Sequence, residues 1–209
     1  LWGREYVMVR PSHFRVEYVI NPFMDPAVQP DPGRAMEQWE ALVAAMAESL
    51  VLQLSGGMRE AFASVWDTQE LSGLRDLREV LHTGLTGMWP LIEATADRQL
   101  LTYEITAYAL RHRAAGAPLA GSVADEQYRV MDIEATVFLE ESARRTGCTW
   151  TEPVEAIARF ALAVIDGIVL RWLVDRDSAA ILTELDDLVR IVGSKAVEAG
   201  TDLDNRSGE

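Results

Sequence analysis

Residues 152–174 read EPVEAIARFALAVIDGIVLRWLV, and this stretch decides the fold class. Pro153 suits the first turn of a helix, because its missing N–H would have no partner there. The predicted helix, from Glu152 to Val174, is apolar nearly all the way round and must be covered on every side. Two arrangements would do this. Either the helix is central in a monomeric bundle, or a second subunit covers one of its faces.

The dimer interpretation places the interface on this helix and on the last predicted helix, from Ser178 to about Val197. The candidate interface residues are Phe160, Val164, Gly167, Ile168, Leu185 and Val189. Gly167 has no Cβ and would let two helix backbones approach closely. We expect a stable interface of this kind to bury on the order of 2,000 Å² or more.

The rest of the chain after residue 57 also has the apolar periodicity of helices. Helices are predicted over residues 58–66, 72 to about 94, 97 to about 113 and 122 to about 146, after an earlier one from Gly33 to about Leu54. Ser72 and Asp97 are expected N-caps. Pro90 is expected to kink or restart the helix that contains it, because proline removes a backbone donor.

The first part of the chain has a different pattern. Residues 5–10 and 16–20 have strand composition, and four prolines between residues 22 and 32 then predict a loop. The sequence therefore predicts a mainly α protein, a multi-helix bundle preceded by a short strand, loop and helix segment. We divide it into residues 1–56, residues 57–198 and a polar tail, residues 199–209.

Composition limits the function classes. The formal net charge is -14 and the pI is about 4.6, so the chain repels nucleic-acid phosphates and direct binding to them is not expected. Cys148 is the only cysteine, which excludes an intramolecular disulfide and leaves too few thiolates for a structural zinc site. No cofactor is expected. Asp166 and Arg171 interrupt the most apolar stretch, and no signal peptide is recognised, so a cytoplasmic protein is expected.

Aromatic and methionine side chains gather in the middle helices, as they do around small-molecule pockets. The candidate ligand-binding residues are Met88, Trp89, Tyr103, Glu104, Tyr108, Tyr128 and Met131. The alternative is that these residues are ordinary core, and that the Glu104 carboxylate reaches solvent. His82 and His112 have no partner at a metal-ligand spacing and are expected at the surface.

Two stretches of the sequence resemble known families. VMVRPSHFRVEYVINPFMD (7–25), followed by AMEQWEAL (35–42), resembles the N-terminal edge of the dimethylarginine dimethylaminohydrolase and amidinotransferase family. The resemblance spans about residues 5–46 and implies an α/β propeller with a nucleophilic cysteine and a histidine. Cys148, in RTGCTW, has no histidine in a recognisable partner motif, so no catalytic residue is assigned and an enzyme is not expected.

The second resemblance spans about residues 58–197. Residues 77–147, from LREVLHTGLTGMWP to EESARRTG, and then EPVEAIARFALAVIDGIVLRWLVDRD (152–177), resemble the C-terminal ligand-binding and dimerisation domain of TetR-type transcriptional regulators. This implies an intersubunit four-helix bundle made by the last two long helices, and a small-molecule pocket enclosed by the preceding ones. The family's helix-turn-helix is not in this sequence, and residues 1–46 carry four arginines against six acidic residues.

We therefore expect a homodimeric sensor domain that binds an apolar or aromatic small molecule and has little affinity for DNA or membranes. Two alternatives stay open. One is a truncated guanidino-group hydrolase, and the other is a fused product without function.

Overall fold

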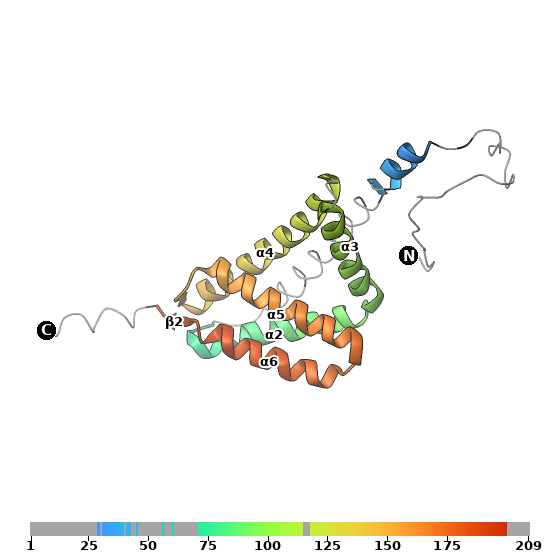
Figure 1. The fold of residues 1–209 in the computed structure, drawn as a ribbon. Coiled ribbons are helices and arrows are strands. Elements are labelled where there is room, and N and C mark those ends of the chain that lie inside the picture. Colours follow the sequence, from blue (N-terminus) through green and yellow to red (C-terminus); the bar gives the residue numbers. More distant parts are fainter. Residues whose placement is uncertain are drawn as a thin grey trace.

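Figure 1 shows the computed structural model of the chain. The structure describes residues 29, 31–39, 41–42, 45, 56, 60, 71–114 and 118–199. This part of the chain is mainly helical and carries one two-stranded sheet. The predicted fold class, a mainly α multi-helix bundle, is confirmed.

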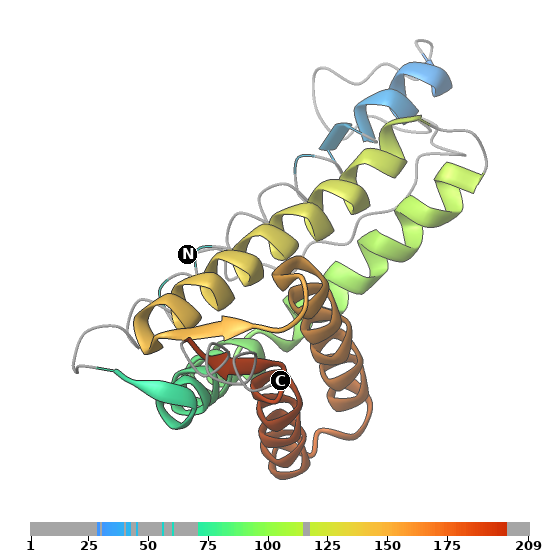
Figure 2. The same cartoon turned by 90° about the vertical axis from the view of Figure 1, so that its left-hand side faces the viewer.

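Five long helices and two short strands lie between residues 73 and 198. They are α2 (Gly73–Glu93), α3 (Ala96–Ala114), α4 (Pro118–Thr146), β1 (Cys148–Trp150), α5 (Val154–Asp175), α6 (Ser178–Gly193) and β2 (Ala196–Glu198). α3 runs outward from the bundle and α4 returns to it (Figures 1 and 2). α4 packs against α2, α3 and α5, while α6 packs against α2 and α5.

The two strands correct the expectation that only helices follow residue 57. Gly147 takes a positive φ of 65° and lies directly after the end of α4. Cys148, Thr149 and Trp150 then pair antiparallel with Glu198, Val197 and Ala196. The last helix therefore ends at Gly193 rather than near Val197. Strands of three residues are too short for an alternating pattern to reveal them.

The starts of α3, α4 and α5 also differ from the prediction, and α5 begins at Val154, with Pro153 at its N-cap rather than in its first turn. α4 begins at Pro118 rather than Ser122, because proline is tolerated in a first turn. Ser72 is the N-cap residue of α2, as predicted, but its side chain makes no capping hydrogen bond, and its N–H donates to Asp76 Oδ2 at 2.8 Å. Asp97 lies in the first turn of α3 rather than at its N-cap.

The break expected at Pro90 does not occur, whereas the helix start predicted at Ser178 does. Pro90 does not restart its helix, because α2 continues through it to Glu93. α6 begins at Ser178 as predicted, and Asp177 Oδ1 accepts a hydrogen bond from the N–H of Ala180 at 3.1 Å. This bond satisfies one of the free donors of the first turn.

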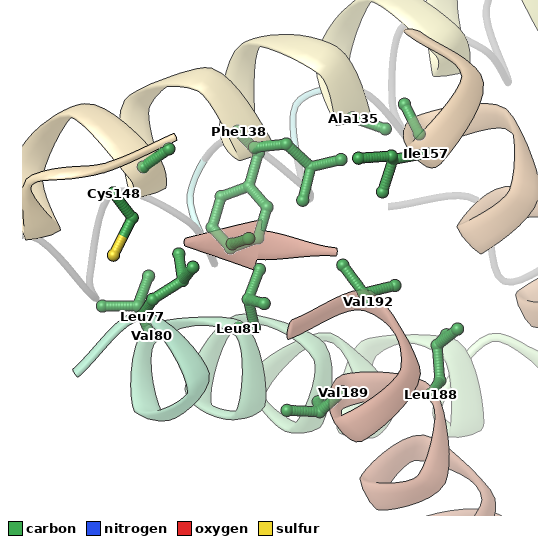
Figure 3. Close-up of a cluster of buried hydrophobic side chains, with 14 of the residues drawn as sticks. Leu77, Val80, Leu81, Ala135, Phe138, Cys148, Ile157, Leu188, Val189 and Val192 are labelled. Atoms are coloured by element: carbon green, nitrogen blue, oxygen red, sulfur yellow. The ribbon is translucent and has the colours of Figure 1, made fainter. Parts of the chain in front are cut away.

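The core forms around α5. Ile157 is buried in a cluster that joins α2, α4, α5 and α6, and in it the ring of Phe138 lies beside Leu81 (Figure 3). Trp172, near the other end of α5, is buried in a second cluster. There its ring meets Trp89 edge-on, with 5.2 Å between centroids. Other helices of the same chain thus cover much of the apolar surface of α5.

Residues 32–39 are helical, so the helix predicted from Gly33 begins one residue earlier. Asp31 Oδ1 accepts a hydrogen bond from the N–H of Arg34 at 2.8 Å. The ring of Trp39 meets Tyr108 of α3 edge-on, with 5.1 Å between centroids. Other predictions lie outside the described residues: the strands at 5–10 and 16–20, the helix at 58–66 apart from residue 60, the boundary after residue 56 and the tail beyond residue 199.

The first cluster yields a stability prediction. Leu77 is fully buried in it, whereas Leu110 on α3 is 46% exposed. Leu77→Ala should lower the free energy of unfolding by about 2–5 kcal/mol, because the neighbours relax only partly into the cavity. Leu110→Ala is the matched control and should cost less than about 1 kcal/mol. Urea unfolding measures both, and equal losses would contradict the described core.

Candidate functional site

A cavity of about 250 Å³ lies between α2, α3, α4 and α5. Its wall is mostly apolar and carries a few polar groups, which is the usual make-up of small-molecule sites. The lining residues are Met88, Leu91 and Ile92 of α2; Ala94 and Thr95; Arg98, Gln99, Thr102 and Tyr103 of α3; Gln127, Tyr128 and Met131 of α4; and Leu162, Ile165, Asp166 and Val169 of α5.

Helical periodicity brings these side chains to one place. On α5 the lining positions recur at spacings of three and four, so Leu162, Asp166 and Val169 share one face. Tyr128 and Met131 of α4 are three residues apart and share a face in the same way. Each helix therefore presents one stripe to the cavity, and α5 contributes the only carboxylate among the described lining residues.

Asp166 is the centre of the polar part of the cavity. The Tyr128 hydroxyl donates a hydrogen bond to Asp166 Oδ2 at 3.0 Å. The Tyr103 hydroxyl donates to the backbone carbonyl oxygen of Asp166 at 2.9 Å. Two tyrosines from α3 and α4 are thereby held against the middle of α5.

Burial controls the protonation of these groups. It raises the pKa of the Asp166 carboxyl, and the hydrogen bond from Tyr128 opposes this only in part. Burial, followed by the nearby Asp166 charge, raises the pKa of Tyr128 to about 12 and also raises that of Tyr103. Both hydroxyls therefore stay protonated at neutral pH and remain donors.

Three further polar residues of the wall are buried: Gln99, Thr102 and Gln127. Gln99 Nε2 donates to Thr95 Oγ1 at 3.2 Å, and Thr102 Oγ1 donates to the backbone carbonyl oxygen of Arg98 at 3.0 Å. Arg98 itself is exposed. The side chains of Gln99 and Thr102 are thus already engaged in hydrogen bonds within α3 and to Thr95.

Four of the seven predicted ligand-binding residues line the cavity, namely Met88, Tyr103, Tyr128 and Met131. The other three lie elsewhere. Trp89 is buried against Trp172. Glu104 is exposed, which agrees with the alternative that its carboxylate reaches solvent. Tyr108 packs against Trp39 near the outer end of α3.

The polar lining residues were missed from the sequence. Asp166 carried the clearest signal, as the one acidic residue in the apolar stretch 160–174. From the sequence alone, Asp166 indicates only that this stretch is not a membrane span. Gln99, Thr102 and Gln127 carried no such signal, because polar residues on a helix normally face solvent.

The structure also corrects the predicted dimer interface. Ile168, Leu185 and Val189 are buried within this chain, because α6 folds back onto α5 and α2. Val164 is half-buried against both clusters. Phe160 and Gly167 are exposed.

An exposed apolar row remains on α5, which we call the α5 stripe. It consists of Ala156, Phe160, Ala163, Gly167, Leu170 and Val174, at alternating spacings of four and three. Phe160 is 39% exposed, Leu170 is 50% and Val174 is 79%. Such spacing places all six residues on one side of the helix.

Other candidate groups lie away from the cavity. Cys148 is buried in the first core cluster, and its thiol points to the carbonyl oxygen of Thr146, at 3.7 Å. His82 is exposed, as predicted, and its Nε2 lies 3.0 Å from Asp186 Oδ1 on α6. The side chain of His112 lies outside the described residues. In the described ranges no cluster of potential metal ligands occurs, and no helix there is long and apolar enough to cross a bilayer.

No protein-family model, curated protein or solved structure matches this chain. What it binds is therefore inferred from the cavity and the α5 stripe.

The raised pKa of Asp166 predicts how stability depends on pH. The folded chain holds this proton to a higher pH than the unfolded chain does, so the stability it provides is complete below the ordinary value of 3.8. It is lost as the pH rises through the folded-state pKa. Asp166→Asn should therefore raise the free energy of unfolding at pH 7 and raise it less at pH 4, as measured by urea unfolding.

Asp125→Asn is the control, because this exposed carboxylate lies in a surface ion pair, 3.1 Å from Arg113. Removing it should give no gain at pH 7. A gain for Asp166→Asn that is as large at pH 4 as at pH 7 would contradict the burial of the charge.

Proposed function

We propose that the described helices form the small-molecule-binding and dimerising sensor domain of a TetR-type regulator. The observation that carries this is the mostly apolar cavity lined by α2, α3, α4 and α5. The resemblance implies a pocket enclosed by the helices that precede the last two, and α2, α3 and α4 do line this cavity, while α5 adds a further wall. The α5 stripe supports the dimerising part.

The size of the cavity favours a ligand of one ring with a short chain. A dry cavity of about 150 Å³ accommodates benzene, and this one is about 250 Å³. Burying roughly 150–250 Å² of an aromatic group contributes about 4–6 kcal/mol before the costs of association. Those costs consume much of it, so polar contacts must add the affinity and orientation that a sensor needs.

The charge pattern argues against DNA binding by the chain itself. Its net charge is -14, and residues 1–46 offer four arginines against six acidic residues. In an intact regulator of this type, ligand binding changes the spacing of two DNA-binding heads. The described helices would supply the ligand-responsive part of such a regulator. Cys148 does not line the cavity, so we do not assign guanidino-group hydrolysis to it.

A second copy of the chain is the partner that the α5 stripe fits. The stripe is symmetric about Ile165: Ala163 and Gly167 lie two residues from it, Phe160 and Leu170 five, and Ala156 and Val174 nine. A two-fold axis at this point would pair small residues with small ones at the centre and place large apolar residues at both sides. An interface made by one patch against itself has this self-complementarity.

Filling the cavity tests the ligand-binding part. Met131 lines the cavity, whereas Ile133, two residues along α4, does not and is 47% exposed. We expect 4-phenylbutan-1-ol to bind with a dissociation constant below about 1 mM, measured by calorimetry. Met131→Trp should weaken binding about tenfold or more by occupying the space, and Ile133→Trp should leave it unchanged. Equal affinities for the two variants would contradict the assigned site.

Two glycines test the dimer. At Gly167 and Gly87 an added Cβ meets nothing within 4 Å, so both positions accept a side chain in the single chain. Replacing either by Met should favour its helix by about 1 kcal/mol. Gly167→Met, at the centre of the α5 stripe, should shift sedimentation from dimer to monomer, while Gly87→Met stays dimeric. A monomeric unsubstituted chain at micromolar concentration would refute the dimer.

A further inference from the structure

Asp166 occupies an unfavourable place for a carboxylate. It is half-buried on the cavity wall, between Ile165 and Gly167 on the otherwise apolar centre of α5. Burying an ionised carboxylate is costly unless a positive charge accompanies it. In the described ranges no arginine, lysine or histidine forms an ion pair with Asp166, and the Tyr128 hydroxyl is its side-chain hydrogen-bond donor.

Surface carboxylates on α4 and α5, unlike Asp166, form ion pairs with arginines. Glu126, Glu141 and Asp175 each pair with an arginine three or four residues away along their helix. Asp166 has no such neighbour, because the residues one turn away from it on α5 are apolar. A carboxylate accepts up to about four hydrogen bonds, so Asp166 retains capacity for a further donor.

The cavity contains one other charged residue, Arg98. Because Arg98 is exposed, water solvates its charge, whereas the Asp166 carboxylate is half-buried in the apolar wall. A charge acts more strongly where the surroundings are less polar. The net charge of -14 adds a long-range attraction for cations.

We propose that the ligand of this cavity is a cationic amphiphile, with an apolar body and a protonated amine, and that Asp166 is its counter-ion. The ammonium group donates to the Asp166 carboxylate and lies beside the rings of Tyr103 and Tyr128, whose faces attract cations. The apolar body packs against Met88, Met131 and Ile165. This assignment rests on the proposed function of the cavity as a ligand site.

Three ligands of matched shape test it: 4-phenylbutylamine, 4-phenylbutan-1-ol and 4-phenylbutanoate. At pH 7 the amine should bind about tenfold or more tighter than the alcohol, as a charge-assisted contact provides, and the acid should bind most weakly. Asp166→Asn should remove the advantage of the amine and leave the affinity for the alcohol within about threefold. Arg98→Gln should leave the preference for the amine in place.

These measurements distinguish failure of the counter-ion role of Asp166 from failure of the ligand site itself. If the alcohol binds but the amine has no advantage, or the acid binds most tightly, the counter-ion role is refuted and the ligand site stands. If none of the three binds to the unsubstituted chain, the ligand site fails as well. Should Asp166→Asn not fold, lowering the pH replaces it. Protonating Asp166 must then weaken the amine and not the alcohol, and parallel behaviour of the two overturns the assignment.

Discussion

The structure depends on removing α5 from water. This helix is apolar nearly all the way round, and each large apolar side chain that it buries contributes roughly 1.5–3 kcal/mol. α4 and α6 both pack on it, and each of them also contacts α2. Ile157 at one end and Trp172 at the other lie in two separate clusters. Burial of this one helix therefore accounts for the packing of α4 and α6 against it.

Neighbouring residues at the centre of α5 face different surroundings. Asp166 lines the cavity, Gly167 belongs to the exposed stripe, and Ile168 is buried in the second core cluster. A helix turns by about a third of a circle over one residue, so these three positions point in different directions. Under the proposed function, the ligand and the second subunit contact the same rigid element. A ligand that moves α5 would thus act directly on the interface.

The carboxylates of the protein differ in whether a nearby arginine stabilises their charge. At the surface, hydrogen bonds from Arg144 and then Arg145 lower the pKa of Glu141 to about 2, so this carboxylate is ionised at little cost. In the cavity, burial raises the pKa of Asp166 and no described cation compensates for it. A titratable group that is perturbed by burial and lies in a cavity is a common property of functional sites. Such a group lowers stability when its site is empty and gains a partner when a cation binds.

The helical class and the start of α6 at Ser178 follow from the sequence, because apolar periodicity is a local property. The predicted start of α5 at Glu152 is two residues before the observed one at Val154. The sequence also predicted four of the residues that line the cavity, namely Met88, Tyr103, Tyr128 and Met131. Three features become visible in the folded chain alone: which residues of α5 and α6 are buried and which form the exposed stripe, the pairing of β1 with β2, and the position of Asp166 in the cavity wall. Periodicity reveals that a residue faces something apolar, but which element covers it depends on packing between segments that are distant in the chain.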